Sequence, residues 1–291
     1  MLAQNQNAVG FQFIPQADND NSFVEKDEIV IYNSRLELVL QVVGVSSPVL
    51  SFLVLQFASL HMTLVLDAIS FFIAFTLVAF LPKKETQEQE KKTFSWKNIF
   101  ADMKEGIRYI WRQQEIFFLL VVASSVNFFF AAFEFLLPFS NRLYGVEGAY
   151  ATILTMGAIG SIIGALLASK IKAGVYNLLI LLALTGVGVF MMGLPLPTFL
   201  SFSGNLVCEL FMTIFNIHFF TQVQTKVEGE YLGRVLSTIF TLAILFMPIA
   251  KGFMTVLPSV HLSSFLIIGS GVIILSCLSL VYVRSHFKKE L

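Results

Sequence analysis

The feature of this sequence that most constrains its fold is a series of apolar stretches, each about 20 residues long. A helix of that length crosses the hydrocarbon core of a bilayer, because it rises about 1.5 Å per residue. The stretches are Leu36 to Phe57, Thr63 to Leu81, Ile116 to Pro138, Tyr150 to Ser169, Tyr176 to Leu194, Leu196 to Phe219, Val235 to Val256 and Ser263 to Val283. They predict an all-α, polytopic membrane protein with about eight transmembrane helices.

The composition agrees with a lipid environment. Hydrophobic residues make up 56% of the chain and charged residues only 13%, whereas soluble domains carry about 25% charge. Lys plus Arg equals Asp plus Glu, at 19 each, so no basic excess indicates a nucleic-acid partner. The partner that the composition predicts is the lipid bilayer.

The distribution of positive charge predicts the orientation. All but two of the 19 Lys and Arg residues fall on the side that would hold both termini and the loop at 82–115. Arg142 and Lys251 are the two exceptions. Because positively charged loops stay inside the cell, we expect a multi-pass protein of the cell membrane with cytoplasmic N- and C-termini.

Five segments follow from these boundaries. They are a cytoplasmic N-terminal segment (1–35), two transmembrane helices (36–81), a cytoplasmic loop (82–115), a six-helix C-terminal bundle (116–283) and a cytoplasmic tail (284–291). Within the loop, Phe94 to Gln113 has apolar residues at helical spacing between charges, which predicts an amphipathic helix on the inner membrane surface.

No pattern in the chain indicates catalysis, and we expect no enzyme activity and no cofactor. Motifs such as HExxH, GxSxG and the phosphate-binding loop are missing from the sequence. Cys208 and Cys277 lie far apart inside apolar runs, without the spacing of a zinc site. We interpret both as buried thiols and expect no metal.

Polar residues inside the predicted spans are the candidates for a transport pathway, since charge in a bilayer is costly and usually faces the interior or water. Glu134 can bind a proton or a cationic drug, or it can reach the outer membrane surface. Asn127 lies seven residues earlier on the same helical face. Glu209 lies near the middle of its span, where it either lines a cavity or makes a packing hydrogen bond. We expect His218, nine residues later, to point to a different face and to be solvated.

Small residues gather on one span. Gly157, Gly160 and Gly164 recur at spacings of three and four residues. Such spacing lets two helix backbones approach closely, and it also permits bending. We interpret these glycines as helix-packing residues with a secondary role as a hinge.

Several short motifs resemble a known family in their order and spacing. Leu66 to Phe72 resembles the sixth-helix signature of the macrolide-efflux-type branch of the major facilitator superfamily. Gly44 to Pro48 is similar to the Gly-Pro kink of its fifth helix, and Phe135 to Pro138 to the end of its seventh. Gln222 to Val235, which contains Gly233 and Arg234, resembles the cytoplasmic loop before its eleventh helix.

This resemblance implies a partial major-facilitator fold: two helices followed by a complete six-helix C-terminal bundle. Gly44 and Pro48 would then be hinge residues, and Gly233 with Arg234 a cytoplasmic loop motif. Against the twelve-helix pattern of the family, the chain corresponds to the last eight helices. We therefore expect a truncation at the N-terminus, and as further partners either the missing N-terminal helices or a second copy.

The function that the resemblance implies is efflux of a hydrophobic, macrolide-like small molecule by proton antiport, a form of antibiotic resistance. The 31 Phe residues suit a hydrophobic substrate. The alternative is a transport-inactive remnant of such a transporter.

The predicted topology is testable by cysteine labelling. With the two native cysteines replaced, a cysteine at Ser59 or Ser259 should react with an impermeant reagent added outside intact cells. A cysteine at Thr86 should be protected, because the loop at 82–115 is expected to be cytoplasmic. Strong outside labelling at Thr86 would contradict the topology.

Overall fold

The structure is a computed structural model, and it describes residues 29–57, 60–79, 96–171, 174–256 and 259–286. These residues are helical, with short turns between the helices and no strand among them. The elements are α1 (Ile29–Phe57), α2 (Leu60–Ala79), α3 (Trp96–Arg112), α4 (Gln114–Leu136), the 3-10 turn η3 (Leu137–Phe139), α5 (Ser140–Tyr144), α6 (Ala149–Ala168), α7 (Val175–Met192), α8 (Thr198–Lys226), α9 (Gly229–Val256) and α10 (Ser263–His286).

Six helices in the described part of the chain are long and apolar enough to cross a membrane: α4 with its extension to Tyr144, α6, α7, α8, α9 and α10. This confirms an all-α polytopic membrane protein. The helices α1 and α2 cover the first two predicted spans. That these two also cross the bilayer, for a total of eight, stays a prediction.

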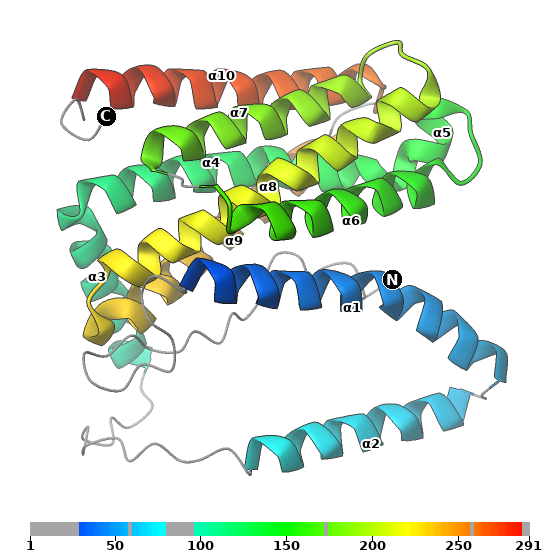
Figure 1. Cartoon of the computed structure of the whole chain (residues 1–291), viewed down its shortest axis with the longest axis horizontal. Helices are drawn as coiled ribbons and strands as arrows, with labels where there is room; N and C mark the ends of the chain where they lie inside the picture. The colour runs from blue at the N-terminus through cyan, green and yellow to red at the C-terminus, as the bar shows by residue number, and fades with distance from the viewer. Residues whose placement is uncertain (1–28, 58–59, 80–95, 172–173, 257–258, 287–291) are drawn as a thin grey trace. The chain divides into compact units, whose positions relative to one another are not determined.

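The described residues form two compact units. One contains the chain up to Gln41 together with Asp102 onward, and the other contains Val42–Ala101. In the larger unit, α6 packs against α8, α7 against both α8 and α10, and α4 against α9 and α10. Figure 1 shows α4, α6, α7, α8 and α10 running side by side along a common direction.

Large apolar side chains fill the space between the helices of the larger unit. Phe133, Ile153, Leu182, Ile214 and Phe265 are each at most 1% exposed. Other large apolar side chains lie on the outside: Phe199, Ile267 and Val281 are about 70% exposed. An apolar exterior over a packed apolar core is what lipid as solvent requires, because lipid-facing residues need no polar cover.

Several helices are longer than their apolar stretches. α8 continues to Lys226, seven residues past the predicted end, and α9 begins at Gly229. The extended residue Val227 separates the two helices. The prediction that Gly233 and Arg234 lie in a loop was therefore wrong, since both are inside α9. Apolar length measures only what crosses the hydrocarbon, and a helix continues into water as long as its sequence permits.

The start of the chain also differs from the prediction. Residues 29–35, assigned to the N-terminal segment, form the first turns of α1. α1 continues as one helix through both Gly44 and Pro48. A Cβ atom at Gly44 would contact nothing within 4 Å. Close packing therefore does not explain this glycine, and its role as a hinge stays a prediction.

The glycines of α6 lie directly against the backbone of α8. A Cβ atom at Gly164 would lie 2.5 Å from the carbonyl oxygen of Leu210, and one at Gly160 would overlap the carbonyl oxygen of Leu206. Gly157 abuts the side chains of Asn205 and Glu209. Neither backbone oxygen can move without displacing α8, so a side chain at Gly160 or Gly164 would push the two helices apart.

We predict that Gly160→Ala destabilises the protein by about 1–3 kcal/mol through overpacking. The measurement is thermal unfolding of the purified protein. Gly252→Ala is the matched control, because Gly252 lies in α9 with nothing within 4 Å of its added Cβ. Equal melting temperatures for the two variants would contradict the close approach of α6 and α8.

Candidate functional site

An ion pair joins two of the membrane-capable helices. The Nζ of Lys251 on α9 lies 3.3 Å from Oε2 of Glu134 on α4, and the two side chains are 38% and 37% exposed. Ionisable residues within spans persist when they pair with one another or face water, and this pair meets the first condition. The pairing was not predictable from the sequence, because only the packing of α4 on α9 brings the two residues together.

A second carboxylate lies on α8. The hydroxyl of Ser161 on α6 donates a hydrogen bond to Oε2 of Glu209, at 3.4 Å. Glu209 also interacts electrostatically with Glu134 and with Glu37 of α1. The larger unit thus contains a Glu134 carboxylate in contact with Lys251 and a Glu209 carboxylate in contact with Ser161.

Asn205 lies one turn before Glu209 on α8 and is 2% exposed. Its Nδ2 donates to the carbonyl oxygen of Ile153 on α6, at 2.8 Å. Its Oδ1 is buried without a hydrogen-bond partner among the described residues. The missing side chain of Gly157 makes room for Asn205 and Glu209, so α6 accommodates two polar groups of α8 at one point.

The structure does not bring Asn127 into contact with Glu134. The two residues are two helical turns apart on α4, a rise of about 10 Å. Asn127 is half-buried. Asn127 and Glu134 therefore lie on the same side of α4, as predicted, but too far apart to form a contact.

The expectation for His218 was wrong. Its side chain is 5% exposed, and Nε2 lies 3.0 Å from the carbonyl oxygen of Ala168 on α6. Glu209 contacts the same helix through Ser161, although the two residues are half a rotation apart around α8. Packed helices cross at an angle, so the line of contact moves around the helix surface along its length.

A buried polar contact joins α1 to α8. The Nδ2 of Asn33, which is 1% exposed, donates to Oε1 of Gln224 at 3.0 Å and to Oγ1 of Thr221 at 3.3 Å. Sequence reasoning missed this contact because Asn33 precedes the first apolar stretch. The only sequence signal for this contact was an Asn residue in a helix that begins before the apolar stretch.

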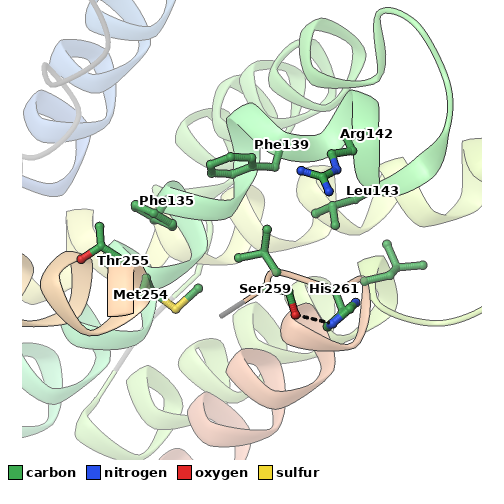
Figure 2. A pocket seen from close by; sticks show the side chains of 10 residues that line it. Phe135, Phe139, Arg142, Leu143, Met254, Thr255, Ser259 and His261 are labelled. Atoms are coloured by element: carbon green, nitrogen blue, oxygen red, sulfur yellow. Dashed lines mark hydrogen bonds between the residues drawn. The ribbon is translucent and has the colours of Figure 1, made fainter. Parts of the chain in front are cut away.

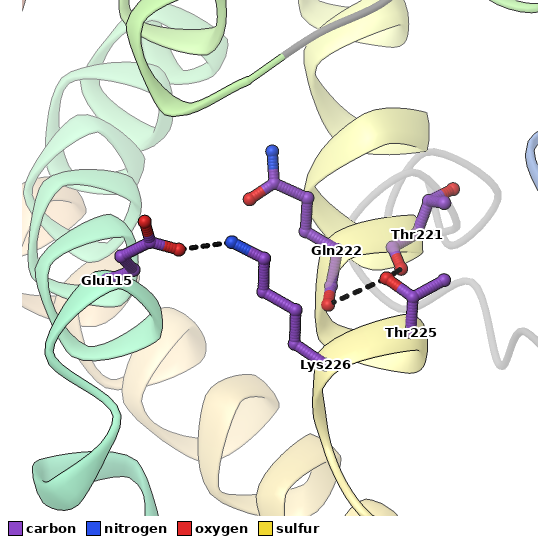
Figure 3. Close-up of polar contacts among 5 residues, drawn as sticks. All are labelled: Glu115, Thr221, Gln222, Thr225 and Lys226. Carbon is purple, nitrogen blue, oxygen red and sulfur yellow. Dashed lines mark hydrogen bonds and ion pairs between the residues drawn. The ribbon is translucent and has the colours of Figure 1, made fainter. Parts of the chain in front are cut away.

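Charged and aromatic contacts surround the turn between α8 and α9. Lys226, at the end of α8, forms an ion pair with Glu115 at the start of α4, and Figure 3 shows the two side chains meeting. The Thr225 hydroxyl donates to the Thr221 carbonyl at 2.8 Å. This hydrogen bond lies within α8, in the turn that leads to Lys226.

α3 packs on the first turns of α9. The rings of Tyr109 and Tyr231 stack with centroids 4.7 Å apart, and the Glu228 amide donates to the Tyr109 hydroxyl at 3.3 Å. Arg234 forms an ion pair with Glu105 at 3.2 Å. Arg234 thus joins α3 to α9, whereas Gly233 has open space beside it.

A separate cleft of about 570 Å³ opens near the other end of α4. Figure 2 shows the ring of Phe139 beside Arg142, and that of Phe135 near Thr255 and Met254. The Ser259 hydroxyl and Nε2 of His261 lie 2.7 Å apart. The cleft does not include Glu134, Glu209 or Lys251.

These groups can exchange protons or bind a cation, because carboxylates inside a bundle can be neutralised by either. Among the described residues, no three His, Cys, Asp or Glu side chains gather as a metal site. Cys208 is buried and Cys277 is exposed, and both are free thiols. The prediction of a buried thiol therefore fails for Cys277, whose face of α10 points away from the core.

Comparison with known proteins places this arrangement in a family. The model of the Major Facilitator Superfamily matches residues 22–243, which include α1 to α8 and the first half of α9. Comparisons with curated proteins and with solved structures gave no match. The matched span includes Glu134 and Glu209. Because it covers well over half of the chain, the chain belongs to the Major Facilitator Superfamily of transporters.

Proposed function

We propose that this chain exports a hydrophobic, macrolide-like drug across the cell membrane in exchange for protons. The observation that carries the proposal is that two membrane-capable helices carry carboxylates held by partners on neighbouring helices, Glu134 by Lys251 and Glu209 by Ser161. A carboxylate within a span takes up a proton from one side and releases it to the other if the surrounding helices change its access. Coupling of drug and proton then needs no cofactor.

Aromatic rings on α8 and α9 support the proposal that the substrate is hydrophobic. Phe220 of α8 and Phe240 of α9 are half-buried and stack with centroids 5.5 Å apart. Phe219 packs edge-on against Phe220 at 5.3 Å. Aromatic side chains offer large apolar contact areas with few internal rotations, and a pocket for a drug-sized molecule is mostly lined by such groups.

The proposal includes the orientation of the chain in the membrane. The charge bias of the loops supports cytoplasmic termini. α3 and the α8–α9 turn would then lie on the cytoplasmic side, and the cleft beside Arg142 on the outer side. Drug would leave from the bundle toward the cleft side.

We predict that Glu209→Gln reduces proton-driven export of a radiolabelled macrolide by about tenfold or more, equivalent to about 1.4 kcal/mol per factor of ten. Gln keeps the size and the hydrogen bond to Ser161 but cannot exchange a proton. The measurement is drug accumulation in vesicles of the purified, reconstituted chain, with and without a protonophore. Glu147→Gln is the control, since Glu147 is exposed in the turn before α6.

Two results would count against the proposal. Export that continues unchanged in Glu209→Gln would remove this carboxylate from the coupling. Export that is insensitive to the protonophore would remove protons from it. The alternative, a transport-inactive remnant, predicts that neither the unmodified chain nor any variant moves drug.

The ion pair between Lys251 and Glu134 predicts a variant that gains binding. Lys251→Gln should increase binding of tetraphenylphosphonium, a hydrophobic cation, by roughly fivefold, because Glu134 loses a competing charge worth about 1 kcal/mol in a hydrated site. Glu134→Gln should weaken the same binding. Equilibrium dialysis of the purified protein measures both. Equal binding by the unmodified chain and Glu134→Gln would exclude Glu134 as the cation site.

A further inference from the structure

α3 has two different faces. The inward face packs on α9 through Gly106, Tyr109 and Ile110, and Ile110 is 1% exposed. The outward face is made of five exposed residues: Lys104, Ile107, Arg108, Trp111 and Arg112. At 100° per residue these five lie within an arc of about 140°. We call them the outward face of α3.

The outward face carries positive charge that the protein does not neutralise. Lys104, Arg108 and Arg112 form no ion pair with a carboxylate in the part of the chain that the structure describes. Glu105, the acidic neighbour on the helix, binds Arg234 on the other side. Three basic side chains at successive four-residue steps are therefore available to an external anion.

Two large apolar side chains share this face. Trp111 is 67% exposed and Ile107 is 42% exposed. A soluble anion would make no use of them. Their presence beside three basic groups matches helices that lie in a membrane interface, where the apolar residues enter the acyl boundary and the cations remain at the headgroups.

The position of α3 in the chain agrees with a helix that lies in the membrane interface. α3 ends at Arg112 and α4, a membrane-capable helix, begins at Gln114. The Trp111 ring packs against Phe117 in the first turn of α4, with centroids 4.8 Å apart. Figure 1 shows α3 turning away from the axis of α4. Indole rings gather at the headgroup level of a bilayer, which is where a residue just before a span would lie.

We propose that the outward face of α3 binds the phosphate headgroups of anionic phospholipids, with Trp111 and Ile107 inserted beside them. Each Lys or Arg near an anionic leaflet contributes attraction, and Arg pairs with phosphate through two parallel hydrogen bonds. The bound lipid would hold α3 in place while its inward face contacts Arg234 and Tyr231 on α9. The site requires only the membrane fold and is independent of the proposed drug export.

The test uses Trp111 as the reporter. In a Trp96→Phe background of the full chain, Trp111 is the only tryptophan, because the sequence has two. The protein is reconstituted in phosphatidylcholine vesicles that contain a fixed fraction of acyl-brominated phosphatidylglycerol or of brominated phosphatidylcholine. We expect stronger quenching by the anionic lipid, with a preference of up to roughly fivefold for each basic residue.

Three variants separate a lipid site from general charge. K104Q/R108Q/R112Q should abolish the preference. K104R/R108K/R112K, which keeps the charges, should retain it. R35Q/K170Q/R284Q removes the same number of exposed cations elsewhere and should also retain it. Circular dichroism checks that each variant keeps its helix content.

Several results would overturn the proposal. Equal quenching by both lipids in the unmodified chain would show no anionic preference. The same loss in R35Q/K170Q/R284Q would reduce the effect to net charge. Relief of the quenching by millimolar inorganic phosphate would assign the face to a soluble anion.

Discussion

The close contact between α6 and α8 is the constraint on which the polar interior of the bundle depends. Lipid gives helices no hydrophobic reason to associate, so packing and hydrogen bonds must hold them together. Gly160 and Gly164 bring the backbone of α6 against carbonyl oxygens of α8. At this short separation Ser161 reaches Glu209, and Asn205 reaches the Ile153 carbonyl. A larger residue at these glycines would leave those polar groups without partners at a cost of about 1–3 kcal/mol each.

α9 connects the two charged regions of the larger unit. Arg234, near its start, binds Glu105 of α3, and Lys251, near its end, binds Glu134 of α4. A displacement of α9 along its axis would therefore change both ion pairs at once. Major facilitator transporters alternate access by rocking one bundle against another. In this chain α9 is the helix that contacts both α3 and the carboxylate of Glu134.

Much of the fold was predictable because lipid leaves few solutions for the backbone. Inside a bilayer every peptide group must be hydrogen-bonded within the protein, and a continuous apolar stretch of about 20 residues meets this requirement as a helix. The amphipathic helix was predictable for a similar reason, since the 3.6-residue period is visible in residues 94–113. Helix ends were less predictable. The turn at Val227 lies among polar residues that permit either a helix or a loop.

The candidate site was predictable only in part. Glu134 and Glu209 stand out because charge inside an apolar stretch is costly. Their pairing with Lys251 and Ser161 was not predictable, since 117 and 48 residues separate the members of each pair. The burial of His218 was likewise not predictable from the sequence. Its position near the end of an apolar stretch suggested solvent, and the crossing of α6 over α8 buried it.

The sequence by itself determined that this protein is helical, lies in a membrane and carries a few costly charges there. These properties follow from local composition and period, which act within one helix and its surrounding lipid. Only the tertiary structure decided which charges pair, which glycines contact a backbone and which face of α3 remains open. Those outcomes depend on how helices distant in sequence cross and rotate against one another, and crossing angles are set by the side chains of both partners together.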